Sequence, residues 1–521
     1  MTTENPHKTS QQTIELKQAS LAKLPAAIEV PNYDRSKLSA GIVHIGVGGF
    51  HRAHQAMYID QLLQQPGNEQ WAICGVGLLE ANRELAQILK QQDYLYTLIV
   101  RHPNGTVENR VIGAMIDFLF APDSQQAVID KLASETTKVV SLTITEGGYH
   151  FNPATGEFDG SHPDIQHDAL NPAQPKTTFG YLAAGLKARR DAGLKPFTVQ
   201  SCDNIQHNGA VTRKMLLAFI ELFDTDLARW VAEHVSFPNG MVDRITPVTT
   251  DNDINYLAHE FAIDDRWPIT CEAFSQWVIE DDFCNGRPDW DRAGGQFVTD
   301  VTPYEKMKIR LLNAGHSVLG LLGAIHGFAT IDEAVCDLLF ARYLRTFMDD
   351  EVTPLLDALP GIDLTAYKDT LIERFSNPNI KDSLARICLQ SSAKLPKFLI
   401  ATVQENLSRV ADSQLDYKAE CQIELATLVL ASWCLYSDKR VDQHGNALEI
   451  SDDMAQELHH HAANTQADPL AFLAIEDLFG DLKHNATFSH VYRQCIARLY
   501  APNLAIKTLM EDQLSASVEV E

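Results

Sequence analysis

The chain has 521 residues, too many for one hydrophobic core, so we expect two or three domains. Hydrophobic residues make up 45% of the sequence and charged residues 21%, which is typical of globular proteins and excludes a disordered or fibrous chain. The formal net charge of -26 argues against nucleic acids and anionic membranes as partners. An anionic ligand would therefore need local positive charge to bind.

The nine cysteines form no CxxC pair, and their odd number suits reduced thiols in a cytosolic protein. We expect neither disulfides nor structural zinc. The N-terminal sequence MTTENPHKTSQQ lacks the apolar segment of a secretory signal. The longest apolar run, residues 318–325, is far shorter than the roughly 20 residues of a membrane-spanning helix. These features predict a soluble cytoplasmic protein.

The first part of the chain predicts alternating strands and helices. Residues 1–30 look like a polar extension. Predicted strands at 41–45, 71–76, 96–100, 111–120 and 139–144 alternate with predicted helices at 51–65, 82–92 and 124–134. This βαβ pattern predicts an α/β fold with a Rossmann-type, doubly wound parallel sheet.

After the alternating strands and helices the pattern changes to a long loop, one more strand and then helices. Residues 148–175 are rich in Gly, Pro, Asn and Asp and predict a long loop, and the strand at 197–201 ends just before Asn204. From about residue 302 onward nearly every segment has helical periodicity. We therefore expect four regions. These are the extension at 1–30, a Rossmann-type domain at 31–300, a mainly helical domain at 301–510 and an acidic tail at 511–521.

A glycine-rich turn follows the first predicted strand and opens the next helix, which is the context of a dinucleotide-binding turn. Gly46 would allow the tight turn and Gly48 the close approach of a pyrophosphate. The third glycine of GxGxxG is replaced by His51, and the first acidic residue after the second strand, Glu80, comes late. A plain strand-to-helix turn is the alternative. The candidate cofactor-binding residues are Ile45, Gly46, Val47, Gly48, Gly49, Phe50 and Glu80.

If Glu80 faces the adenosine ribose, NAD is favoured over NADP as the cofactor, and NADP stays an alternative.

Polar side chains gather on one side of a helix that is predicted to begin near residue 303. Measured from Lys308 at about 100° per residue, Glu305 lies near 60°, His316 near 80° and Asn313 near 140°. Lys306, at about 160°, is expected to face solvent. The helix continues into an apolar segment and so is predicted to be buried. The alternative is a surface pair of Glu305 and Lys308 with a structural His316.

Six blocks of the sequence occur in an order that is similar to one family. They are GVGGFHRAH (46–54), TEGGY (145–149), SCDNIQHNG (201–209), MVDRITP (241–247), PYEKMKIRLLNAGHS (303–317) and FSNPNIKDSLARI (375–387). Together they resemble the polyol-specific long-chain dehydrogenases, and among these most closely the mannitol 2-dehydrogenases. The resemblance covers roughly residues 40–500.

The resemblance implies oxidation of a secondary alcohol of a sugar alcohol with NAD(P) and without a metal. Lys308 matches the family's general base. Its predicted burial would let it lose its proton near neutral pH, as a base must. Asn204 and Asn313 match a pair of amides that form an oxyanion hole. By the same resemblance His316 orients the substrate or the lysine, and Glu305 relays the proton or tunes the charge of Lys308. A helix-capping role is the alternative for Asn204.

Three further residues match positions that bind the remaining hydroxyl groups of a polyol, namely Asp243, Arg386 and Lys394. Arg386 and Lys394 would share one helix face at i,i+8. The alternative is an ordinary ion pair of Asp382 with Arg386 at i,i+4. His51 and His54 have no third partner for a metal, so we expect no metal site.

The leading prediction is an NAD-dependent mannitol 2-dehydrogenase that interconverts D-mannitol and D-fructose. A hexuronate reductase acting on fructuronate or tagaturonate, or an arabinitol 4-dehydrogenase of the same family, is the alternative. From another class, the chain could be a nucleotide-binding sensor without chemistry, although a sensor does not need Lys308 with Asn204 and Asn313. The resemblance also implies a monomer that binds a small polyol or ketose.

Overall fold

The computed structural model describes residues 13–151, 156–413 and 422–518. The chain divides into two compact units, Met1–Thr302 and Pro303–Glu521, which we call the sheet unit and the helical unit. No helix among the described residues is long and apolar enough to cross a membrane. The eight cysteines in the described part are free thiols, and Cys421 lies outside it.

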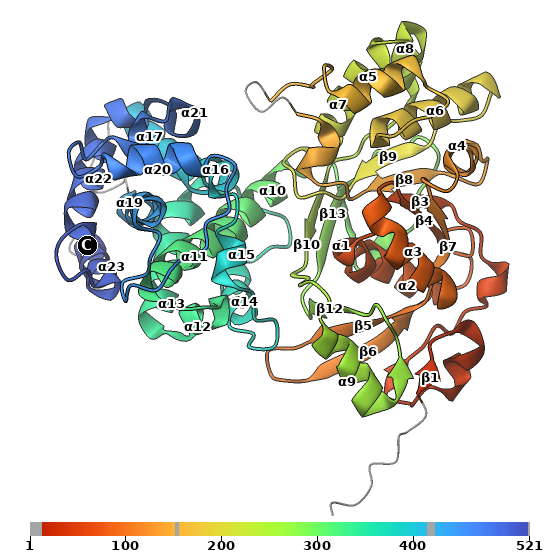
Figure 1. The fold of residues 1–521 in the computed structure, drawn as a ribbon, viewed down its shortest axis with the longest axis horizontal. Helices are drawn as coiled ribbons and strands as arrows, with labels where there is room; N and C mark the ends of the chain where they lie inside the picture. The colour runs from red at the N-terminus through yellow and green to blue at the C-terminus, as the bar shows by residue number, and fades with distance from the viewer. Residues whose placement is uncertain (1–12, 152–155, 414–421, 519–521) are drawn as a thin grey trace, which may run out of the picture. The chain divides into compact units, whose positions relative to one another are not determined.

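A five-stranded parallel sheet is the centre of the sheet unit (Figure 1). In spatial order its strands are β7 (Met115–Phe120), β4 (Ile73–Gly77), β3 (Ile42–Ile45), β8 (Val139–Leu142) and β9 (Thr198–Ser201). In chain order, β4 and β7 follow on one side of β3, and β8 and β9 then follow on the other side. In such sheets ligands bind at the carboxyl ends of the strands beside this switch point.

Helices cover both faces of this sheet, as the two separate core clusters show. On one face lie α4 (Gln125–Ala133), α6 (Thr178–Asp191), α7 (Asn208–Glu221) and α8 (Thr225–His234). On the other lie α2 (Gln55–Leu63) and α3 (Arg83–Gln91). Strands buried on both faces must be almost continuously apolar, which explains sequences such as IVHI in β3.

Smaller sheets complete the unit, with α9 (Asp251–Phe261) beside them. A four-stranded sheet joins β12 (Ile269–Glu272), β5 (Tyr96–Arg101), β6 (Val107–Ile112) and β2 (Ile28–Glu29). A three-stranded sheet joins β10 (Gly240–Asp243), β13 (Gln276–Glu280) and β14 (Gln296–Val298), and β1 (Ile14–Glu15) pairs with β11 (Ile263–Asp264). Because β1 and β2 join sheets, residues 14–29 are more ordered than a polar extension would be.

Three local predictions were wrong. The predicted strand at 111–120 is two strands in different sheets, because β6 ends at Ile112 and β7 begins at Met115, after Gly113, where an added Cβ would lie 2.7 Å from Pro31. The predicted helix at 51–65 is interrupted at His54, between α1 (Gly49–Ala53) and α2. The predicted loop at 148–175 contains α5 (Pro163–Leu170), which begins with proline at its first position.

The helical unit is built around α11 (Ala314–His326) and α19 (Glu424–Lys439), which pack against each other. Other α-helices are α10 (Thr302–Lys308), α12 (Ile331–Cys336), α13 (Leu338–Thr346), α14 (Leu364–Phe375), α15 (Leu384–Ile387), α16 (Ser391–Leu395), α17 (Ala401–Ser413), α20 (Ala455–Ala463), α21 (Glu476–Phe479), α22 (Ala486–Leu499) and α23 (Ile506–Val518). Among the described residues of this unit three segments are π-helical, η6 (Ile309–Asn313), η7 (Phe347–Val352) and η9 (Pro396–Ile400). Part of the predicted acidic tail is therefore helical, and residues 519–521 lie outside the described residues.

Short 3₁₀ turns occur in both units. They are Gln18–Lys23, Arg35–Lys37, Glu80–Asn82, Glu146–Tyr149, Trp290–Ala293, Thr353–Leu355, Phe472–Ala474 and Gly480–His484.

Candidate active site

The glycine-rich turn lies where β3 ends, beside the switch point of the sheet. Gly46 has φ +94°, and an added Cβ there would lie 2.1 Å from the carbonyl oxygen of Thr143, so no other residue fits. At Gly48, just before α1, the nearest atom to an added Cβ would be 3.8 Å away. The turn is therefore tight against the sheet at Gly46 and open at Gly48, as a phosphate-binding turn requires.

His51 occupies the position of the missing third glycine. Its ring stacks on the ring of His44 from β3, with centroids 3.4 Å apart and an interplanar angle of 13°. Burial lowers the pKa of His44 to about 3 and the pKa of His51 well below its usual value, so both rings are neutral near pH 7. The stacked imidazoles thus replace the close helix–strand contact that a third glycine usually allows.

The other predicted residues of the turn are held by packing. Ile45 and Val47 are buried, and an added Cβ at Gly49 would lie 3.1 Å from the side chain of Ile269. Phe50 stacks on the ring of His54 with centroids 4.8 Å apart. The His51 and His54 rings are both in aromatic contacts, and the described residues contain no group of three or more potential metal ligands.

Glu80 lies three residues after β4, the neighbour of β3. Its side chain is 68% exposed and forms an ion pair with Arg83, which lowers the pKa of the carboxyl group. Arg83 also reaches Asp123 at 3.1 Å and lies over the ring of Phe120. An exposed acid at this strand end can meet a ribose, and the arginine that neutralises it is a feature that the sequence analysis missed.

Asn204 is exposed at the carboxyl end of β9, and its flanks are fixed by buried side chains. Asp203 accepts hydrogen bonds from the backbone N–H groups of Ile144 and Thr145, which follow β8. Asn208 donates to the carbonyl oxygen of Asp203 and to that of Gly240. Asn204 is not the N-cap of α7, because that helix begins after His207.

Thr145 has φ +58° and ψ 172°, a conformation that is rare for a β-branched residue and costs about 1–3 kcal/mol. Such strain is common at ligand-binding edges. Neither this strain nor the carboxylate of Asp203 was predicted, although the sequence Asp203–Asn204 directly after a strand was a usable signal.

Asp243 is buried at the end of β10, opposite Gln276 of β13. The next residue, Arg244, donates to the carbonyl oxygen of Ala53 at 2.7 Å and to that of Glu272 at 3.0–3.1 Å. Ala53 is the last residue of α1, so Arg244 ties the end of the helix that opens at the glycine turn to the strand that carries Asp243.

In the helical unit the predicted single helix is interrupted by a π turn. Residues 309–313 are π-helical, and Ala314 donates its N–H to the carbonyl oxygen of Ile309, five residues earlier. A π turn advances roughly 80° per residue instead of about 100°. The angle from Lys308 to Asn313 therefore falls from about 140° to roughly 40°, and His316 moves to about 20° on the other side of Lys308. The uniform α-helical angles were wrong, and the π turn brings these residues closer to one line.

Lys308, Glu305 and Asn313 are buried, and His316 is half-buried with its ring 4.5 Å from the ring of Phe375. A buried lysine is unusual and favours a functional role. Burial of Glu305 and Lys308 contradicts the alternative of a surface pair.

The prediction that Lys306 faces solvent was wrong, because it is partly buried and forms an ion pair with Glu405 of α17 at 2.6 Å. Arg310, inside the π turn, donates to Thr402 at 2.5 Å and lies 3.4 Å from Glu405. These contacts anchor the outer side of the π turn to α17.

Arg386 and Lys394 do not share one helix. Arg386 is in α15 and Lys394 is in α16, and between them Gln390 has φ +52°, which breaks the helix. The predicted alternative is present, since Arg386 forms an ion pair with Asp382. The Arg386 side chain remains 53% exposed. Lys394 donates to the carbonyl oxygen of Ile387 at 3.2 Å.

Comparison with known proteins decides the family. Residues 40–292 match the mannitol dehydrogenase Rossmann domain, and residues 300–500 match the mannitol dehydrogenase C-terminal domain. The chain belongs to the mannitol dehydrogenase family.

Relatives within this family are similar over almost the whole chain. Mannitol 2-dehydrogenase of Pyricularia oryzae is 46% identical over 88% of this chain and 90% of its own length. That of Aspergillus fumigatus is 46% identical over 90% of this chain and 93% of its own. The structure of Pseudomonas fluorescens mannitol 2-dehydrogenase in a ternary complex with NAD and D-mannitol is 45% identical, with a TM-score of 0.85 over 96% of this chain and all of that one. A substrate-free D-sorbitol dehydrogenase structure is 36% identical, with a TM-score of 0.85 over 95% of this chain and all of that one.

Membership in the mannitol dehydrogenase family confirms three predictions. These are the resemblance to polyol-specific dehydrogenases, the Rossmann-type domain followed by a helical domain, and the enzyme class of an NAD-dependent polyol dehydrogenase. The sensor alternative is not needed to explain any feature of the chain.

Proposed function

We propose that the protein is an NAD-dependent mannitol 2-dehydrogenase that reversibly oxidises D-mannitol to D-fructose without a metal. The observation that carries the proposal is the 45% identity, at a TM-score of 0.85, to a mannitol 2-dehydrogenase in complex with NAD and D-mannitol. The buried Lys308 and the π turn beside it support the same reaction.

In the proposed mechanism Lys308 is the general base. Its burial favours the neutral amine, which can remove the proton from the reacting hydroxyl group. The amides of Asn204 and Asn313 donate hydrogen bonds to the oxygen as it gains negative charge. Bound NAD would supply the acceptor for the hydride that leaves the carbon atom bearing this hydroxyl group. In the reverse direction Lys308 returns the proton to the oxygen of the ketose.

The remaining polar residues would bind and orient the substrate. His316 positions the reacting end of the polyol. Glu305, three residues before Lys308, passes the proton taken up by Lys308 to solvent. Asp243, Arg386 and Lys394 hold the other hydroxyl groups. Of these, Arg386 has the weakest support, because its guanidinium already forms an ion pair with Asp382.

The two domains would bind different ligands, one the cofactor and the other the substrate. Residues 31–300 bind NAD through Ile45 to Phe50 and Glu80, and residues 301–510 bind the substrate. The open position at Gly48 supports pyrophosphate binding. A monomer in the cytoplasm stays our prediction, which light scattering of the purified protein and fractionation of the source cells can check.

An assay of cofactor turnover with several substrates tests this function. We expect NADH consumption with D-fructose to exceed that with fructuronate and tagaturonate, and NAD reduction with D-mannitol to exceed that with D-sorbitol and D-arabinitol. Prolonged dialysis against EDTA should leave the rate unchanged. A strong preference for fructuronate would contradict the proposal and favour the hexuronate reductase, and a preference for D-arabinitol would favour an arabinitol dehydrogenase.

A further inference from the structure

The carboxylate of Asp203 connects three segments at the carboxyl edge of the sheet. One oxygen accepts from the N–H of Ile144 at 3.1 Å and from the hydroxyl of Tyr149 at 2.7 Å. The other accepts from the N–H of Thr145 at 2.9 Å. Tyr149 is fully buried and also lies 2.7 Å from the hydroxyl of Ser201, the last residue of β9. The end of β8, the turn after it and the end of β9 are thus held together.

This connection continues to the glycine turn. The hydroxyl of Thr143 donates to the carbonyl oxygen of Gly46 at 2.6 Å, and Thr143 is only two residues before the strained Thr145. An amide N–H that donates to a buried carboxylate can hold a residue at an unfavourable φ. Asp203 therefore lies between the turn that follows β3 and Asn204, which directly follows it in the chain.

We propose that Asp203 is a positioning residue of the reaction, because its carboxylate fixes the end of β9 against the Thr145 turn and so aims the amide of Asn204. The proposal rests on the proposed function, in which Asn204 donates a hydrogen bond to the reacting oxygen. Asp203 itself is buried and engaged by three donors, so it acts through Asn204 and not on the substrate.

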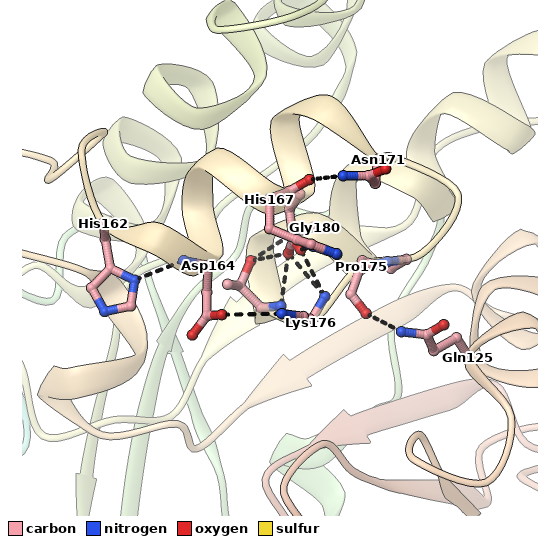
Figure 2. Close-up of polar contacts among 10 residues, drawn as sticks. Gln125, His162, Asp164, His167, Asn171, Pro175, Lys176 and Gly180 are labelled. Atoms are coloured by element: carbon pink, nitrogen blue, oxygen red, sulfur yellow. Dashed lines mark hydrogen bonds and ion pairs between the residues drawn. The ribbon is translucent and has the colours of Figure 1, made fainter.

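A second buried aspartate in the sheet unit, Asp168, provides a matched control. Figure 2 shows the segment around it, with His167 and Lys176 labelled. Asp168 of α5 accepts from the backbone N–H groups of Lys176 and Thr177 at 2.8–3.0 Å and from the Thr177 hydroxyl at 2.8 Å. Like Asp203 it accepts from two consecutive backbone amides and one hydroxyl, and in addition the Nδ1 atom of His167 lies 2.9 Å from one of its oxygens. It differs in place, because it joins α5 to the start of α6 and no predicted site residue is adjacent to it. Loss of Asp168 should therefore cost stability alone.

The test is a double-mutant cycle of Asp203→Asn with Asn204→Ala, measured by fructose reduction in the full-length enzyme. Asparagine places an amide N–H₂ where one oxygen accepts, so at least one donor loses its partner. We expect Asp203→Asn to lower kcat on the order of 100-fold in the parent enzyme, as a displaced catalytic group does, and to leave the Kd of NADH unchanged. In the Asn204→Ala background the same change should lower kcat by less than about threefold, because the amide is already absent.

Asp168→Asn should lower the Tm about as much as Asp203→Asn but keep kcat within about twofold of the parent enzyme. Should Asp203→Asn not fold, Tyr149→Phe is the milder variant, because it removes one donor to the carboxylate and keeps both backbone N–H bonds. We expect Tyr149→Phe to lower kcat by about threefold to tenfold in the parent enzyme only.

Each outcome decides one claim. The double mutant could lose kcat by the product of the two single-mutant factors, that of Asn204→Ala and that of Asp203→Asn (or of Tyr149→Phe in its place). Such independent effects would overturn the positioning role and leave a purely structural aspartate. An Asn204→Ala enzyme as active as the parent would instead contradict the proposed role of Asn204. Coupled losses of kcat, with an active Asp168→Asn enzyme, support the proposal.

Discussion

The two units hold their candidate catalytic groups in different ways. In the sheet unit the groups follow strand ends, and the register of parallel strands together with buried side chains such as Asp203 sets their places. In the helical unit Lys308, Asn313 and His316 belong to one helix, and a single π turn sets their relative angles. The first arrangement is distributed over many contacts, and the second depends on one local irregularity. An inserted residue should therefore be more damaging in the helical unit.

The largest expected effect is that of Lys308→Ala. Without the base, we expect mannitol oxidation to fall by about 10³-fold or more, while the Kd of NADH, measured by fluorescence titration, stays near that of the parent enzyme. Lys306→Ala is the matched control on the same helix, and it should retain most of the activity because Lys306 pairs with Glu405. If turnover survives in Lys308→Ala, the assigned base is wrong.

Insertion of one alanine between Lys308 and Ile309 tests whether the angle between the base and the amide of Asn313 matters. One added α-helical residue would rotate Asn313 and His316 by about 100° relative to Lys308. We expect turnover to fall on the order of 100-fold while circular dichroism still shows a folded helical protein. Deletion of Ile309 is the matched control, because four α-helical residues place Asn313 at the same angle of about 40° as the five π-helical residues do. An active insertion variant would show that this angle does not set the catalytic geometry.

Opposite pH dependences of stability should separate the two units. In the helical unit, burial and the neighbouring Glu424 raise the pKa of Glu351 to about 8, against two hydrogen bonds from backbone N–H groups that lower it. A raised carboxyl pKa gives stability that is complete below the unfolded pKa of about 4.5 and is lost as pH rises through 8. Hydrogen exchange, corrected for the intrinsic exchange rate at each pH, measures the opening equilibrium of α19. This opening should increase from pH 5 to pH 7, up to about 100-fold.

In the sheet unit, burial lowers the pKa values of His44 and His54 to about 3. The neutral rings give stability that is complete above the unfolded pKa of 6.5 and is lost as pH falls towards 3, so opening of β3 should decrease as pH rises from 4 to 6. Glu351→Gln is the control, because it should remove the pH dependence of α19 and leave that of β3. Parallel trends in both units would contradict these assignments.

The smallest expected effect concerns the cofactor. Glu80→Ser should reduce the preference for NAD over NADP by about tenfold, because it removes the repulsion of a 2′-phosphate and one of the two ion pairs of Arg83. Asp123→Asn is the matched control. This change also removes an ion pair of Arg83, but residue 123 does not follow β4. The ratio of kcat/KM values for the two cofactors measures the effect, and equal ratios in both variants would remove Glu80 from the ribose site.

Much of the fold could be predicted, because strands buried on both faces leave continuous apolar runs and Gly46 marks a turn that no other residue can make. The family blocks then directed attention to Lys308 and Asn313. Geometry that depends on backbone irregularity was missed. Helical periodicity assumes one constant angle, so neither the π turn at residues 309–313 nor the break at Gln390 was visible.

Long-range contacts were missed for a different reason. The pairing of Asp203 with Thr145 joins residues 58 positions apart, and the stacking of His44 on His51 depends on how α1 meets β3. Local pattern contains no information on either contact. The ion pair of Asp382 with Arg386, by contrast, lies at i,i+4 and was foreseen as an alternative.

A crystal structure of the enzyme with NAD and D-mannitol tests the central claim most directly. The account predicts the Nζ atom of Lys308 at about 2.6–3.2 Å from the oxygen on C2 of mannitol, with the amides of Asn204 and Asn313 within hydrogen-bond distance of the same oxygen. A polyol bound with that oxygen away from Lys308, or in contact with neither asparagine, would contradict it.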